Sequence, residues 1–144
     1  MKLSENFTLA EMTVSETGVR HGIDNTPDNT SLMNLRRLAL LLEDVRKILN
    51  KPIHINSAYR NLQINKLINS KSSSQHCKGA AADIRVTGMT PDQVVRAIVQ
   101  SNLDYDQVIR EFDSWTHISI TNKKEAKARK QALIIDRKGT RPFL

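Results

Sequence analysis

Apolar side chains recur at intervals of three or four between Ser31 and Leu49, and this is the clearest periodic pattern in the chain. The spacing predicts an amphipathic helix, whose apolar positions are Leu32, Leu35, Leu38, Leu42, Val45 and Leu49. The helix is expected to end at Asn50-Lys51-Pro52, because proline cannot continue a helix.

Three weaker patterns predict shorter helices within residues 7–20, 60–70 and 90–101. A capping box of Thr8 and Glu11 opens the first of them, since each side chain can bond the backbone N–H of the other residue. In the second helix, Leu62 and Leu67 are expected to face the core.

Alternating or short apolar runs predict strands at residues 53–58, 80–86, 107–112, 115–121 and 131–136. The third and fourth of these strands are expected to pair around a tight turn at Asp113-Ser114. Because helices come first and strands dominate the second half, the fold class is α+β, a mainly antiparallel sheet with helices packed on one side. The length favours one domain, residues 1–144, in which the segment 122–144 completes the sheet.

Charge is concentrated at the C-terminal end of the chain. The sequence has 22 basic and 15 acidic residues, a net charge of +7, and residues 122–144 contain eight basic and two acidic residues. Such a segment suits a polyanion, whether nucleic acid, a membrane surface or an anionic cell-wall polymer. The aromatic content of 4% is too low for a platform on which single-stranded nucleic acid stacks. Charge alone does not decide among these partners, and it equally fits a solvated, solubilising edge.

The first residues and the single cysteine limit the remaining classes. The N-terminal sequence lacks the apolar core of a secretory signal, and no apolar run reaches the length of a membrane span. We accordingly expect no membrane span and synthesis in the cytoplasm, and a monomer is the default expectation. Cys77 has no partner for a disulfide, and a Cys-rich zinc site is excluded, so any metal ligands must be His, Asp or Glu.

Two of the four histidines, His76 and His117, lie near acidic residues. Two imidazoles and one carboxylate form a three-ligand zinc site whose fourth position is open to water, and a nearby carboxylate can deprotonate that water. His76, Asp83 and His117, with Glu111 or Asp113, supply these groups. A charged Asp83 inside an apolar strand is also costly unless it binds a metal or another cation.

An exact motif strengthens this interpretation. Ser-x-His-x-x-Gly-x-Ala-x-Asp is matched at every position by Ser74, His76, Gly79, Ala81 and Asp83, and Trp115-x-His117 follows downstream. With these motifs the sequence resembles the zinc D-Ala-D-Ala metallopeptidases, a superfamily that includes the lysostaphin-type endopeptidases and the hedgehog signalling domain. It looks most like the small phage- and prophage-type peptidases that cleave peptidoglycan cross-links, and the resemblance covers nearly the whole chain.

The resemblance implies a hedgehog-like fold with a zinc site on the sheet. Its ligands would be His76, Asp83 and His117. The resemblance also places Arg60, in the segment Ser57-Ala58-Tyr59-Arg60, at the site. A guanidinium there can hold the substrate carboxylate or the developing oxyanion, because its fork meets two oxygens at once.

One position departs from the pattern of the superfamily. Many members place the catalytic acid three residues before the last histidine, where this chain has Ser114. Glu111 lies six residues before His117, a spacing similar to that of the hedgehog branch and the small phage-type peptidases. Asp113 is the competing candidate for the general base, and of the two we favour Glu111.

The expected function is a zinc-dependent peptidase acting on peptidoglycan stem peptides or cross-links, as a D,D-carboxypeptidase or as an endopeptidase of the endolysin type. With this function, the expected partners of the basic segment are anionic cell-wall polymers, and no nucleic acid is expected. The alternative is a catalytically inactive, zinc-containing module that binds the cell wall, which the serine at the usual acid position keeps open. A phage enzyme of this kind would reach the wall through holin-dependent release or as part of the virion.

Overall fold

The computed structural model describes residues 1–144 and contains five α-helices, one 3-10 helix and six strands. The helical elements are α1 (Leu9–Thr13), α2 (Glu16–Arg20), α3 (Asn29–Leu49), α4 (Leu62–Leu67), η1 (Gln75–Lys78) and α5 (Pro91–Val99). The strands are β1 (His54–Ser57), β2 (Ala81–Arg85), β3 (Gln107–Glu111), β4 (Trp115–Ser119), β5 (Gln131–Asp136) and β6 (Gly139–Pro142).

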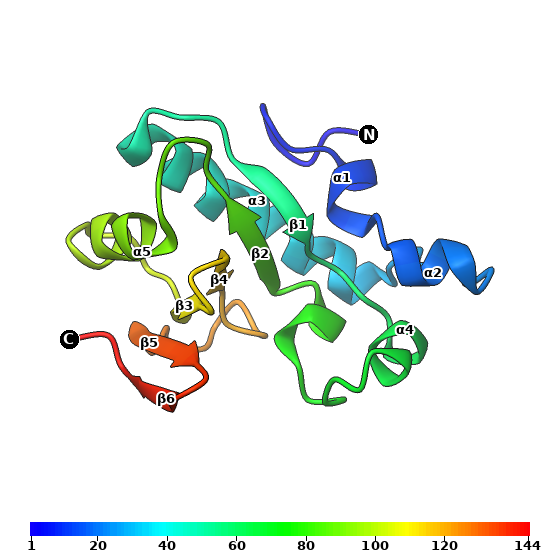
Figure 1. The fold of residues 1–144 in the computed structure, drawn as a ribbon. Helices are drawn as coiled ribbons and strands as arrows, with labels where there is room; N and C mark the ends of the chain where they lie inside the picture. The colour runs from blue at the N-terminus through cyan, green and yellow to red at the C-terminus, as the bar shows by residue number, and fades with distance from the viewer.

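All six strands form one sheet in the order β1-β2-β4-β3-β5-β6 (Figure 1). Every neighbouring pair is antiparallel except β3 and β5, which run parallel. The predicted α+β class with a mainly antiparallel sheet is therefore confirmed. The strands β5 and β6 extend the sheet at its β3 edge, and β6 is an addition to the predicted elements.

The core lies on one face of the sheet, beneath α3 and α5. Alternation along the strands sends every second side chain to this face. The buried cluster combines α3, α5 and the central strands through Leu35, Leu38, Leu42, Val45, Val94, Val95, Ile98, Ala82, Ile84, Val108 and Ile118. The opposite face of β2 and β4 is left free for polar side chains.

The long helix matches its prediction closely, with Asp28 as its N-cap and Asn50 in the left-handed region at its end. The expected helix within residues 7–20 is divided into α1 and α2, because Val14 is extended and Ser15 caps a second helix. The capping box of Thr8 and Glu11 is present. None of the helices combines the length and the apolarity that a membrane crossing needs.

The short helix α4 differs from its prediction. Leu62 and Leu67 are 59% and 46% exposed, so the inward orientation expected for them is wrong. Ile64 and Asn65 are the buried residues of this helix. In a helix of so few residues the apolar spacing alone does not determine which side faces the protein.

Candidate metal centre

Two of the expected ligands lie directly opposite each other on neighbouring strands. Asp83 of β2 pairs with His117 of β4. Their neighbours Ile84 and Ile118 are fully buried in the core on the other face, so Asp83 and His117 point to the face that α3 and α5 leave open. The sheet register alone therefore brings a carboxylate and an imidazole together.

The third expected ligand, His76, lies in η1, which directly precedes β2 in the sequence. Ser74 caps η1 by accepting a hydrogen bond from the backbone N–H of His76, and Gly79 ends it with φ of +71°. A Cβ at Gly79 would lie 2.5 Å from the backbone oxygen of Ser31. Glycine is therefore required here for its conformation and for its close approach to α3.

One hydrogen bond fixes the tautomer of His76. Its Nδ1 lies 2.6 Å from the carbonyl oxygen of Ala58, and because a carbonyl only accepts, Nδ1 carries the proton. The lone pair of Nε2 then faces Asp83, whose Oδ2 lies 3.4 Å away. This is the arrangement in which a histidine binds a metal while its other nitrogen is held by the protein.

The three side chains fit a zinc ion. Nδ1 of His117 lies 3.0 Å from Oδ1 of Asp83, and one ligand atom from each of His76, Asp83 and His117 lies within 4.8 Å of the others. Tetrahedral ligands at zinc distances of ~2.1 Å lie about 3.4 Å apart, and two imidazoles with one carboxylate are a typical catalytic zinc donor set. The donor atoms therefore have both the chemistry and the spacing that zinc requires.

Burial shifts the pKa values of these groups in one direction, and hydrogen bonds and neighbouring charges shift them in the other. Burial lowers the pKa of His76, which favours the neutral imidazole that a metal needs. Burial would raise the pKa of Asp83, but hydrogen bonds with His117 and His76 outweigh it and lower that pKa below its usual range. The cluster thus holds a carboxylate and at least one neutral imidazole near neutral pH.

Glu111 ends β3 on the face that carries His117. The hairpin register pairs Ile109 with His117 and Glu111 with Trp115 without a shift, so Glu111 and His117 share one face and lie diagonally across the two strands. Burial, and after it the negative charge of Asp83, raises the pKa of Glu111. A carboxyl with a raised pKa can both accept and donate a proton near neutral pH.

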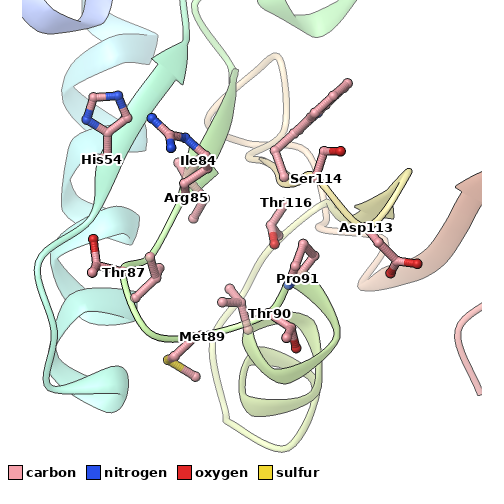
Figure 2. Close-up of a pocket in the computed structure, with 13 residues that line it drawn as sticks. His54, Ile84, Arg85, Thr87, Met89, Thr90, Pro91, Asp113, Ser114 and Thr116 are labelled. Carbon is pink, nitrogen blue, oxygen red and sulfur yellow. The ribbon is translucent and has the colours of Figure 1, made fainter.

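Asp113 lies in the turn of the same hairpin, and the structure does not bring it to the cluster. Its side chain is 66% exposed and forms an ion pair with Arg110, with Oδ1 2.6 Å from Nε. Figure 2 shows the Asp113 carboxylate directed away from β2.

The turn itself is centred on Phe112 and Asp113, both at positive φ, one residue earlier than predicted. Ser114 is exposed and donates its hydroxyl to the carbonyl of Phe112.

Arg60 lies beside the cluster, and hydrogen bonds fix the position of its guanidinium. Its Nε donates to Oδ1 of Asn65, its Nη1 donates to Oγ of Ser57, and the same Nη1 lies 4.0 Å from Asp83. Its backbone N–H donates to the carbonyl of His76. Burial lowers the pKa of Arg60, and Asp83 is the main group that opposes the shift. The guanidinium is thus fixed next to the ligands by groups that leave it positively charged.

Two supporting contacts were not predicted as functional. No sequence pattern reports the carbonyl of Ala58, because it is a backbone group brought to His76 by the fold. Asn65 lies five residues after Arg60, on the buried side of α4, and a polar residue there could have indicated a partner for the guanidinium. Cys77 is buried beside His76 and makes no disulfide.

A mainly antiparallel sheet that carries a His-Asp-His cluster and an adjacent glutamate on one face has the groups that a metal-dependent hydrolase needs. The family model of peptidase M15 matches residues 5–119, and the chain therefore belongs to the peptidase M15 family. This confirms the resemblance to the zinc D-Ala-D-Ala peptidases. The family consists of zinc-dependent peptidases, so the chain is a hydrolase by family. No curated protein matches it significantly. The match ends at the last residue of β4, so β5 and β6 lie beyond it.

Proposed function

We propose that this protein is a zinc metallopeptidase that hydrolyses peptide bonds in peptidoglycan stem peptides or cross-links, as a D,D-carboxypeptidase or an endopeptidase. The observation that carries the proposal is the convergence of His76, Asp83 and His117 on the open face of the sheet, with Glu111 on the same face. Membership of the M15 family supports the reaction class.

The three ligands have distinct roles in this proposal. His76 offers Nε2 because Ala58 occupies its Nδ1, His117 offers the Nδ1 that now faces Asp83, and Asp83 supplies the negative charge. When bound, zinc supplies a Lewis acid that polarises the scissile carbonyl and makes water more acidic. The site keeps limited access to solvent, since the side chains of Asp83 and His117 are 15% and 11% exposed.

Glu111 is the proposed general base. Its carboxylate accepts a proton from the attacking water and then donates it to the nitrogen of the leaving amine, so a single group serves both steps. Its raised pKa and its position diagonal to His117 on the same face support this assignment over Asp113. Asp113, the competing candidate, is engaged by Arg110 in the turn.

Arg60 is proposed to bind a substrate carboxylate or the oxygen that gains charge during the reaction. Asn65 and Ser57 hold its guanidinium beside the ligands, which reduces the entropy lost when it binds substrate. The basic segment 122–144, which includes β5 and β6 of the same sheet, is proposed to hold the protein on anionic cell-wall polymers. In this view residues 1–144 act as one domain.

The test is incubation of purified muropeptides from several wall types with the zinc-loaded protein, followed by mass spectrometry. We expect products whose masses identify the cleaved bond and which disappear when a chelator is added. Zinc-loaded Glu111→Gln protein is the matched control, because it keeps the ligands and loses the base. Absence of cleavage in every wall type, despite stoichiometric zinc, would contradict the proposal and favour an inactive wall-binding module.

A further inference from the structure

A pocket of about 490 Å³ opens beside the metal cluster, where β2 and the β3–β4 hairpin diverge. We call it the notch. Figure 2 shows its walls, with Arg85 and His54 at one end, Met89 and Thr90 at the other, and Ser114 on the hairpin.

Two residues of the notch wall continue the rows of expected ligands on the open face, while Ile84 and Val94 of the covered face also line the notch. Arg85 follows Asp83 by two positions on β2, and Trp115 precedes His117 by two positions on β4. Side chains two positions apart on a strand share a face and are separated by about 7 Å. A peptide lying across the cluster therefore extends into the notch within about two residues of the scissile bond.

Arg85 is an exposed cation without an acidic partner. Its Nε donates to Oδ1 of Asn56 at 2.7 Å, while no carboxylate lies within 4.0 Å of its guanidinium. Arg110, on the neighbouring hairpin, is by contrast paired with both Asp92 and Asp113. Arg85 is thus oriented through one nitrogen, and its two terminal nitrogens are free to meet a ligand.

The orientation of Arg85 is a consequence of a β-bulge. The register between β1 and β2 shifts between Ile55 and Ser57, which makes Asn56 the additional residue. Bulges re-aim the side chains near them, and here the re-aimed amide holds the guanidinium of Arg85. Figure 2 shows the Arg85 guanidinium and the His54 ring on the same side at the head of the notch.

Trp115 lies on the opposite wall of the notch. Its Nε1 is buried, makes no hydrogen bond of good geometry, and lies near enough to the Glu111 carboxylate to lower the pKa of that group. Trp115 lines the notch and stands between it and His117 along β4. The negative charge in the wall, that of Asp113, is already neutralised by Arg110. The notch therefore presents the free terminal nitrogens of Arg85 and a net positive charge.

We propose that the notch is a substrate subsite that binds a carboxylate of the peptide, with the terminal nitrogens of Arg85 as its donors. This inference rests on the proposed function and deepens it. Arg60 and Arg85 then lie on two sides of Asp83, and the preferred substrate carries a carboxylate at the notch in addition to the group that Arg60 holds.

The test compares two synthetic stem peptides that differ only in having a free side-chain carboxylate or its carboxamide. We expect the zinc-loaded wild type to cleave the carboxylate peptide with a kcat/KM roughly 10- to 100-fold higher, since a charge-assisted, two-pronged hydrogen bond is lost in the amide. Arg85→Gln should remove this preference by slowing only the carboxylate peptide, and Arg85→Lys should restore part of it.

A matched control and a second readout separate this inference from the proposed function. Arg20→Gln removes another exposed arginine without an ion pair, on α2, and should leave the preference unchanged. The fluorescence of Trp115, the one tryptophan of the chain, reports peptide binding in the notch even where no bond is cut.

Equal handling of the two peptides by the wild type, or an equal loss for both in Arg85→Gln, would overturn the subsite while leaving the peptidase intact. Absence of cleavage with retained, Arg85-dependent binding of the carboxylate peptide would instead contradict the proposed peptidase and support the subsite.

Discussion

The two faces of the central strands are built from alternate residues of the same short segments, yet they follow opposite rules. On one face, Ile84 and Ile118 are fully buried beneath α3 and α5. On the other face, Asp83 and His117 meet at 3.0 Å and keep partial access to solvent. Burial of apolar area on the first face raises the free energy of unfolding. Holding polar groups close together and partly buried on the second face lowers it.

The comparison shows that residues on the covered face stabilise this fold, while residues on the open face carry the polar groups of the candidate site. A shift of one residue along β2 would exchange the core residue Ile84 for Asp83, a proposed zinc ligand, so both faces depend on the strand register. Substitutions at adjacent positions should therefore give unrelated defects, and the following predictions use such pairs to test the separation.

The largest effect is expected from Asp83→Asn compared with its neighbour Ile84→Val. Asparagine removes the negative charge from the ligand set, so zinc should be lost on dialysis and turnover should fall to background. Ile84→Val should keep zinc and turnover, and should lower the free energy of unfolding by about 0.5–1.5 kcal/mol. Metal analysis and urea unfolding measure both outcomes. Stoichiometric zinc in Asp83→Asn would remove Asp83 from the ligand set.

The second-largest difference is expected between the two acidic residues of the β3–β4 hairpin, Glu111 on the open face and Asp113 in the turn. Glu111→Gln should retain zinc but lower kcat by roughly 10²- to 10⁴-fold, the usual contribution of a general base. Asp113→Asn should change kcat less than about threefold, because Asp113 is mostly exposed and pairs with Arg110. Steady-state kinetics on the cleaved muropeptide decides between them. The reverse ranking would make Asp113 the base.

On the covered face, Ile118→Ala should destabilise the protein without a specific catalytic defect. Ile118 is fully buried between the sheet and the helices, and truncation of such a side chain costs about 2–5 kcal/mol. The matched control is Ile48→Ala on α3, whose side chain is 44% exposed and should matter by less than about 0.5 kcal/mol. Denaturant unfolding gives both values. A large drop in kcat per folded molecule for Ile118→Ala would show that the faces are coupled.

Much of this arrangement could be predicted because its signals are local. The periodicity of α3 and the apolar run of β2 report that these segments are buried, and the motif from Ser74 to Asp83 indicates the proposed chemistry. Gly79 is explained by its positive φ and by the backbone of Ser31. These features depend on residues close in sequence or on a strict pattern.

What could not be predicted depends on contacts between distant segments. The parallel pairing of β3 with β5 and the addition of β6 are choices of topology that no local pattern reports. The bulge at Asn56, which orients Arg85, becomes visible only when β1 and β2 are paired. The choice of Glu111 over Asp113 likewise depends on where the turn falls, and the turn begins one residue earlier than expected.

The smallest effect is expected at the end of the sheet, where Asp106 joins the site to the C-terminal segment. Its buried carboxylate accepts hydrogen bonds from Gln75 of η1 and from Arg129. Burial would raise the pKa of Asp106, but these bonds outweigh it and lower the pKa. Asp106→Asn should therefore reduce the free energy of unfolding at neutral pH by about 1–3 kcal/mol. The control is Asp104→Asn, which removes an exposed pair with Lys130 and should cost less than about 1 kcal/mol.

The pH dependence gives this last prediction its sign. Because the folded pKa of Asp106 is lower than the unfolded one, its ionised form stabilises the fold above the ordinary value of about 3.9, and this contribution is lost as the pH falls through the folded pKa. The difference in unfolding free energy between wild type and Asp106→Asn should therefore shrink as the pH is lowered below about 4. A constant difference from neutral to acidic pH would show that Asp106 acts through packing, and η1 with its His76 would then be held by the covered face rather than by charge at the end of the sheet.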